Sequence, residues 1–185
     1  MTDQIVHATF GACELRVAAE SERIVEGIVV PWGETSFLTP DPKGERFRAG
    51  SLSRTIAEKG DRVKLFRSHN HERAVGRAIA WKPDHDTGCW AQFRVGTGVD
   101  GDALLAEVSD GLLDSFSVGF QPIRTQRGAD GAREILEARL HEVSIAPIGA
   151  YDGARVLAMR TPTVRRVELP PPPDIDWSPL PILVH

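Results

Sequence analysis

The chain has 185 residues, of which 41% are hydrophobic and 26% are charged, as is typical of a globular protein with one core. Its formal net charge is −4 and its basic residues are scattered, which argues against a nucleic-acid-binding protein. It has neither a signal-peptide pattern nor an apolar stretch long enough to span a bilayer, so we expect no membrane association. Cys13 and Cys89 lie in no cysteine motif, which favours a reduced compartment.

The first half of the chain predicts short strands and one short helix. Residues 1–22 are weakly patterned and are expected to form an N-terminal arm or an edge segment. A helix is expected over residues 51–59, with Ser51 as its N-cap and Gly60 as its stop. The expected strands are 23–30, 45–47, 63–66, 74–81 and 89–95.

The second half predicts a longer helix followed by two long strands. Residues 102–113 have an apolar stripe at helical spacing, which ends at Leu112, and Asp102 stands at the positive end of the helix. Strands are expected over residues 115–123 and 134–146, and a last strand or the start of a helix over residues 155–160. The expected fold is therefore α+β, mostly β with a few helices, and a compact, partly closed β-barrel.

A change of composition marks the end of the core. Four consecutive prolines, residues 170–173, favour an extended polyproline II segment that cannot join a helix or a sheet. We therefore expect a folded domain over residues 23–160 and a proline-rich tail over residues 161–185, which acts as a spacer or a binding peptide.

Two alternating strings and one histidine-rich turn carry the chemistry. In residues 115–120 (SFSVGF), Ser115, Ser117 and Gly119 share one face; in residues 140–145 (LHEVSI), Glu142 and Ser144 share one face. Residues 68–71 (SHNH) supply imidazole directly after an apolar run. A serine in a strand is more often a small packing residue than a nucleophile. Hydroxyl, imidazole and carboxylate are nevertheless the three parts of a serine-hydrolase site.

Four strings, residues 63–70, 74–77, 112–120 and 141–145, together resemble the prohead (capsid maturation) proteases of tailed phages, from about residue 24 to residue 160. The resemblance implies a herpesvirus-protease-like barrel with His69 as the base, Ser117 as the nucleophile and Glu142 as the third member. His71 would then be a surface or supporting residue, and Ser115 and Ser144 are the alternative hydroxyls. His141 is the alternative third member, because distant relatives of this barrel use a histidine there. The loop from Gly149 to Arg155 would supply the oxyanion donors.

The resemblance implies a serine endopeptidase that cleaves the scaffolding segment of the major capsid protein precursor, and itself, within the assembling procapsid in the host cytoplasm. It also implies a homodimer, because herpesvirus-type relatives are active as dimers. We expect no cofactor, no nucleic acid and no membrane partner. The alternative is a non-enzymatic capsid-assembly module with the same barrel fold and a tail that binds a partner.

Three other motifs are rejected as functional sites. The H-N-H letters of residues 69–71 lead into a turn and a strand rather than into a nuclease helix. Residues 96–101 spell the dinucleotide-binding glycine pattern, but Asp100 and Asp102 would repel a pyrophosphate. His69, His71 and His85 do not have the spacing of a standard zinc site, so no metal is expected.

Overall fold

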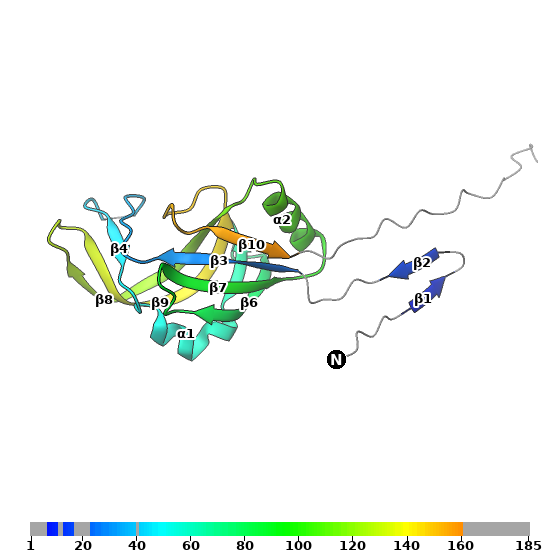
Figure 1. The fold of residues 1–185 in the computed structure, drawn as a ribbon, viewed down its shortest axis with the longest axis horizontal. Helices are drawn as coiled ribbons and strands as arrows, with labels where there is room; N and C mark the ends of the chain where they lie inside the picture. Colours follow the sequence, from blue (N-terminus) through cyan, green and yellow to red (C-terminus); the bar gives the residue numbers. More distant parts are fainter. Residues whose placement is uncertain (1–6, 11–12, 17–22, 40, 161–185) are drawn as a thin grey trace, which may run out of the picture. The chain divides into compact units, whose positions relative to one another are not determined.

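The computed structural model describes residues 7–10, 13–16, 23–39 and 41–160 (Figure 1). The chain divides into two units, one made of Met1–Ala19 and Thr163–His185 and the other of Glu20–Pro162. In the first unit, β1 (His7–Phe10) pairs antiparallel with β2 (Cys13–Arg16). The predicted tail, 161–185, lies outside the described residues, as does the rest of the predicted arm.

The second unit is built on one eight-stranded sheet. Its strands are β3 (Ile24–Pro31), β4 (Glu45–Phe47), β5 (Lys64–Arg67), β6 (Ala74–Lys82), β7 (Gly88–Val95), β8 (Ser115–Arg127), β9 (Arg133–Ala146) and β10 (Val156–Arg160). The strand order is β10-β3-β7-β6-β5-β9-β4, and β8 pairs with β9. Among the described strands, the two end strands β10 and β4 are not paired with each other, so hydrogen bonds do not close the sheet.

Strand β9 organises the part of the sheet that matters for function. Along its whole length it pairs antiparallel with β8. Its other edge is shared by two parallel strands, β4 at its beginning and β5 at its end. The second unit is therefore mostly β with two α-helices, which confirms the predicted fold class at this level.

The strands form where the sequence alternates or is continuously apolar. Strand β7 alternates buried and half-buried residues, whereas nearly all of β3 is buried, in accordance with its apolar composition. Three phenylalanines, Phe47, Phe93 and Phe116, are fully buried and come from three different strands. Phe93 and Phe116 lie with their ring centroids 5.8 Å apart, which links the β3–β7 side of the core to β8.

The first helix, α1 (Ser53–Lys59), begins later than predicted and ends at the predicted residue, with Gly60 at its C-cap. Leu52 occupies the N-cap position and no side chain caps the helix, so the predicted Ser51 cap is wrong. The Ser51 backbone instead accepts a hydrogen bond from the Ala138 N–H of β9. Gly60 does not stop the chain in a left-handed turn, because it continues into the 3₁₀ helix η2 (Gly60–Arg62) beneath the Trp81 ring, whose Nε1–H donates to the Gly60 carbonyl (3.0 Å).

The second helix, α2 (Val99–Ser109), is shifted toward the N-terminus relative to the prediction. It starts after Gly98, whose φ of 117° is accessible to glycine, and it ends before the predicted stripe is complete. Leu112 therefore lies beyond the helix and is 63% exposed. Asp102 forms an ion pair with Arg23 (2.7 Å), which ties the first turns of α2 to the start of β3. Among the described residues, no helix is long and apolar enough to cross a membrane.

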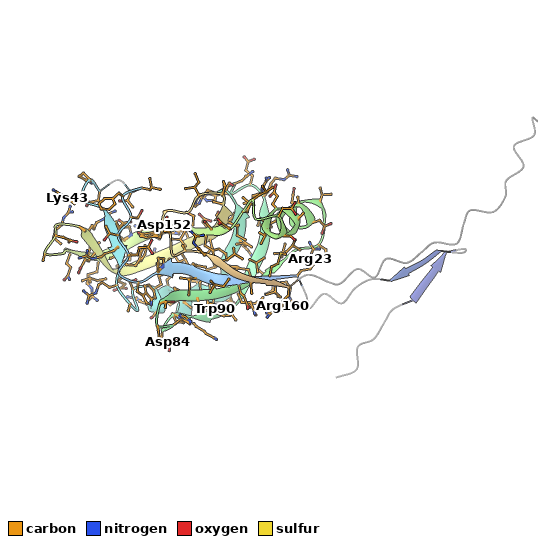
Figure 2. The ribbon with its side chains drawn as sticks, turned by 45° about the horizontal axis from the view of Figure 1, so that its top comes forward. Arg23, Lys43, Asp84, Trp90, Asp152 and Arg160 are labelled. Atoms are coloured by element: carbon orange, nitrogen blue, oxygen red, sulfur yellow. The ribbon has the colours of Figure 1, made fainter. Side chains whose placement is uncertain are left out.

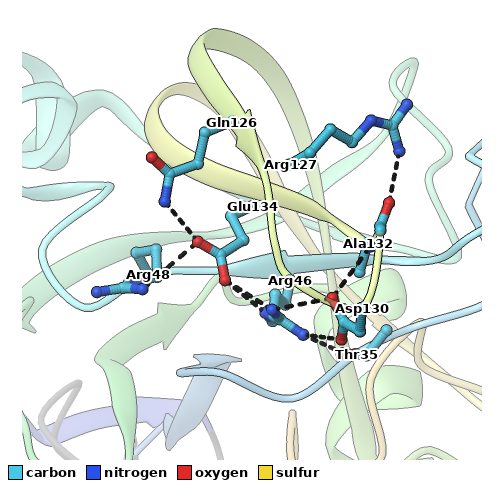
Figure 3. Close-up of polar contacts among 9 residues, drawn as sticks. Thr35, Arg46, Arg48, Gln126, Arg127, Asp130, Ala132 and Glu134 are labelled. Atoms are coloured by element: carbon cyan, nitrogen blue, oxygen red, sulfur yellow. Dashed lines mark hydrogen bonds and ion pairs between the residues drawn. The ribbon is translucent and has the colours of Figure 1, made fainter.

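Different charged side chains lie at the two ends of the second unit (Figure 2). Arg23 and Arg160 lie together at the end where β3 begins and β10 ends. At the other end, near Lys43 (Figure 2), a partly buried ionic network holds the turn between β8 and β9 (Figure 3).

Glu134 is the centre of this network. Its carboxylate accepts hydrogen bonds from Gln126 (2.7 Å) and Arg46 (2.6 Å), and Arg46 also donates to Asp130 (2.6 Å) (Figure 3). The hydrogen bonds from Gln126 and Arg46 lower the pKa of Glu134, and the hydrogen bond from Arg46 lowers the pKa of Asp130. These paired charges join β4 to the β8–β9 hairpin without leaving a buried charge unpaired.

Candidate active site

The predicted hydroxyl, imidazole and carboxylate meet in one chain of hydrogen bonds. His69 Nε2 lies 3.0 Å from the Ser117 Oγ, and His69 Nδ1 lies 2.6 Å from Oε1 of Glu142. The Glu142 side chain is 5% exposed and the His69 side chain is 45% exposed. The carboxylate is therefore enclosed, while the imidazole edge that faces the serine is open to solvent. This is the arrangement of a nucleophile, a base and a group that orients the base.

Two neighbouring strands, β8 and β9, and the turn that follows β5 supply the three residues. Ser117 lies on β8 opposite Ser144 of β9, and Gly119 lies opposite Glu142. On the other edge of β9, the end of β5 pairs with the same stretch, so that Arg67 lies opposite Ile145. Strand β9, which carries Glu142, thus lies between β8, which carries Ser117, and β5, which leads into His69.

The backbone turns sharply at the histidine. Ser68 and His69 have φ values of 49° and 59°, in the left-handed region that residues other than glycine rarely adopt. The turn is held by the Ser68 N–H, which donates to the Ile145 carbonyl (2.9 Å), and by the His69 N–H, which donates to the Ser144 Oγ (3.0 Å). A strained backbone that its surroundings hold in place is characteristic of functional sites.

Ser144 is buried and contacts both the backbone of His69 and the carboxylate of Glu142. It is fully buried, which removes it from contact with a substrate. Its Oγ donates to Oε2 of Glu142 (2.8 Å) while accepting from the His69 backbone, so one hydroxyl positions two members of the triad. Sequence reasoning considered only its nucleophilicity. The signal for the supporting role was its place two residues from Glu142 on the same face. The other alternative, Ser115, donates its hydroxyl to Asp114 (2.7 Å).

Gly119 makes room for the carboxylate. A Cβ atom at this position would lie 2.8 Å from Oε1 and 3.0 Å from Cγ of Glu142. The missing side chain suggests space for an approaching substrate, but the structure fills that space with Glu142. Any larger residue on β8 at this position would displace the triad carboxylate.

His141 and His71, the two other histidines considered for the site, lie outside this chain of hydrogen bonds. His141 is exposed and, among the described residues, no hydrogen bond or ion pair joins it to His69. His71 is 67% exposed, lies 3.8 Å from Oε1 of Glu142 and packs its ring against Phe66 (5.3 Å between centroids). Of the two candidate third members, only Glu142 contacts the imidazole of His69.

A metal could in principle be held by His69, His71 and Glu142, whose ligand atoms lie within 4.8 Å of one another. Two imidazoles and one carboxylate are a donor set that zinc accepts. The hydrogen bond from His69 to Glu142 already accounts for the closeness of these two residues. The absence of a resident metal therefore stays a prediction.

The predicted oxyanion loop packs directly against the start of β8. A Cβ at Gly149 would lie 2.8 Å from the Phe116 carbonyl oxygen and 3.1 Å from the Ser115 Cβ. The Phe116 N–H donates to the Ala154 carbonyl (2.7 Å), and Arg155 forms a bridge with Ser115. The loop from Gly149 to Arg155 is thus anchored one to two residues before the candidate nucleophile.

A cavity of about 440 Å³ opens beside the triad, with Ser117 and His69 among its lining residues. A cavity of similar size, about 480 Å³, lies elsewhere, along the basic ends of β6 and β7. The volume of the first is within the range of small-molecule and side-chain sites. Of these two cavities, it is the one that borders the Ser117 hydroxyl.

The sequence matches the caudovirus prohead serine protease family over residues 12–168. The chain belongs to this family. The family predicted from the sequence is therefore confirmed. No curated protein matches the chain.

Two solved structures are similar to this chain at low sequence identity. One is the KSHV protease in complex with a hexapeptide phosphonate inhibitor, with 13% identity and a TM-score of 0.46 over 73% of this chain; the match spans only 64% of the KSHV chain. The other is the bacteriophage T4 capsid assembly protease, with 12% identity and a TM-score of 0.47 over 78% of this chain and 90% of the T4 chain.

Proposed function

We propose that the chain is a serine endopeptidase in which Ser117 is the nucleophile, His69 the general base and Glu142 the group that orients the base. The observation that carries the proposal is the continuous chain of hydrogen bonds from Ser117 through His69 to Glu142. In the sequence His69 lies 48 positions from Ser117 and 73 positions from Glu142. Local structure therefore does not account for the contacts among the three residues.

The reaction follows from the roles of these groups. His69 Nε2 takes the proton from the Ser117 hydroxyl as the oxygen attacks the peptide carbonyl, and Glu142 stabilises the imidazolium that forms. The imidazolium then gives its proton to the leaving amine, which breaks the peptide bond and leaves an acyl-enzyme. A water molecule, activated by the same imidazole, releases the acyl group and restores the serine. Backbone N–H groups of the loop from Gly149 to Arg155 are the proposed donors to the oxyanion.

The proposed substrates are the scaffolding segment of the major capsid protein precursor and the chain itself. Membership in the prohead protease family supports this proposal, because a prohead is the shell in which such precursors are processed. The proposed place of action is the assembling procapsid in the host cytoplasm, and the proposed active form is a homodimer. The finer architecture, a partly closed barrel, is proposed from the way in which β4 and β5 share one edge of β9.

The test is a nucleophile substitution with a matched control. Ser117→Ala should abolish cleavage of the capsid precursor and labelling by a fluorophosphonate, while leaving the melting temperature close to that of the wild type. Ser115→Ala removes a hydroxyl from the same face of the same strand and should keep both activities. Labelling of Ser115, or cleavage by the Ser117→Ala variant, would refute the assignment. Failure of the wild type to cleave the precursor or react with the probe would favour the non-enzymatic assembly module.

A further inference from the structure

The cavity beside Ser117 has both apolar walls and a polar patch. Phe120 and Tyr151 both pack edge-on against the buried Phe47, with ring centroids 4.7 Å and 5.8 Å from it, so these walls are fixed by the core. Besides Ser117 and His69, its lining includes Thr39, Glu45, Phe120, Arg133 and Tyr151.

Polar atoms without partners gather at this cavity. Of the six buried side-chain nitrogen and oxygen atoms that lack a hydrogen-bond partner in the described residues, three belong to its lining: Thr39 Oγ1, Arg133 Nε and the Tyr151 hydroxyl. Tyr151 itself is only 5% exposed. Leaving a buried polar group without a hydrogen bond is costly, so three of them at one cavity call for an explanation. A ligand that supplies the missing hydrogen bonds explains them.

The charges of the cavity are balanced. Glu45, which is 2% exposed, forms an ion pair with Arg133, and these are the only carboxylate and guanidinium among the lining residues. Burial, together with the nearby Glu45 carboxylate, raises the pKa of Tyr151, so its hydroxyl keeps its proton. A charged side chain that entered would therefore find both charges of the cavity already paired with each other.

We infer that this cavity binds the substrate side chain that precedes the scissile bond, and that it selects a neutral carboxamide, glutamine. This inference rests on the proposed function. A carboxamide oxygen accepts from the Arg133 Nε–H and the Tyr151 hydroxyl, and its NH₂ group donates to Glu45 or to Thr39. Leucine would leave these groups unpaired, glutamate would face Glu45, and lysine would face Arg133. The aliphatic part of glutamine matches the apolar walls.

The test is a set of peptides that differ only in the residue before the scissile bond, namely Gln, Glu, Lys or Leu. Wild-type protease should cleave the Gln peptide with a kcat/KM at least about tenfold above each of the others, since sites built to hydrogen-bond a group discriminate strongly against analogues that lack it. Tyr151→Phe and Thr39→Val each remove one hydroxyl and should lower the Gln-to-Leu ratio several-fold. Thr97→Val, a threonine of the remote cavity, is the matched control and should not change the ratio.

A charge substitution sharpens the test. Glu45→Gln leaves Arg133 without its counter-ion and should move the preference from Gln toward Glu; a melting curve checks that the variant folds. A preference for Leu, Lys or Glu in the wild type, or a Gln-to-Leu ratio that neither hydroxyl variant changes, would overturn this inference and leave the proposed endopeptidase intact. Cleavage of none of the four peptides, together with no cleavage of the capsid precursor, would overturn both.

Discussion

Replacing Glu142 with glutamine tests the part of the site that sequence reasoning left open. The two carboxylate oxygens have different partners: Oε1 accepts from His69 Nδ1 (2.6 Å) and Oε2 accepts from the Ser144 hydroxyl (2.8 Å). A carboxamide has only one accepting oxygen. If that oxygen stays with Ser144, its NH₂ group faces Nδ1 and holds His69 in the tautomer whose Nε2 already carries a proton. The imidazole then cannot take the proton from Ser117.

The expected loss follows from this tautomer. The comparable carboxylate-to-amide change in the Ser-His-Asp triad of trypsin-like proteases lowers kcat about 10⁴-fold, which corresponds to about 5 kcal/mol of transition-state stabilisation. We expect a similar loss for Glu142→Gln, measured as kcat on a peptide substrate. Glu137→Gln, a carboxylate on the same strand that pairs with Arg54 (3.3 Å), is the control and should retain wild-type activity.

Two results would refute this reasoning. One is a Glu142→Gln variant within about tenfold of the wild type, which would show that the carboxylate does not orient the base. The other is a severe loss in His141→Ala alongside a mild loss in Glu142→Gln, which would make His141 the third member. Melting curves of each variant exclude unfolding as the cause.

Two further predictions concern residues around the triad and the hairpin. Gly119→Ala places a Cβ 2.8 Å from Oε1 of Glu142 and should lower kcat/KM about 10²-fold, whereas Gly96→Ala, with 3.5 Å to its nearest neighbour, should not; equal activities would contradict the close approach. The pKa of Glu134 is lowered in the fold, so its contribution to stability is full above its ordinary value of 4.5 and is lost as the pH falls through the lowered value. The melting temperature of the wild type should therefore exceed that of Glu134→Gln by a constant margin above about pH 5 and by a shrinking margin below it; a margin independent of pH down to about pH 2 would refute this account.

The sequence determined the strands and the faces of their side chains. The predicted strands lie within a few residues of β3 to β10, because a two-residue period and β-branched runs express a local preference of the backbone. The same period placed Glu142 and Ser144 on one face of their strand, and Ser115 and Ser117 on one face of theirs, before any pairing was known. The start of α1 and both bounds of α2 were less well predicted, because contacts such as the pairing of Asp102 with Arg23 are tertiary.

The tertiary structure alone decided how these faces meet. Nothing in the sequence states that β5 and β8 flank β9, since the hydrogen bonds that join His69 to Ser117 and to Ser144 span 48 and 75 residues and depend on the whole core. The left-handed turn at His69, the support from buried Ser144 and the fit of Glu142 over Gly119 all follow from that arrangement. Local periodicity encodes the direction in which a side chain points, whereas only the packing of distant strands decides which other side chain it reaches.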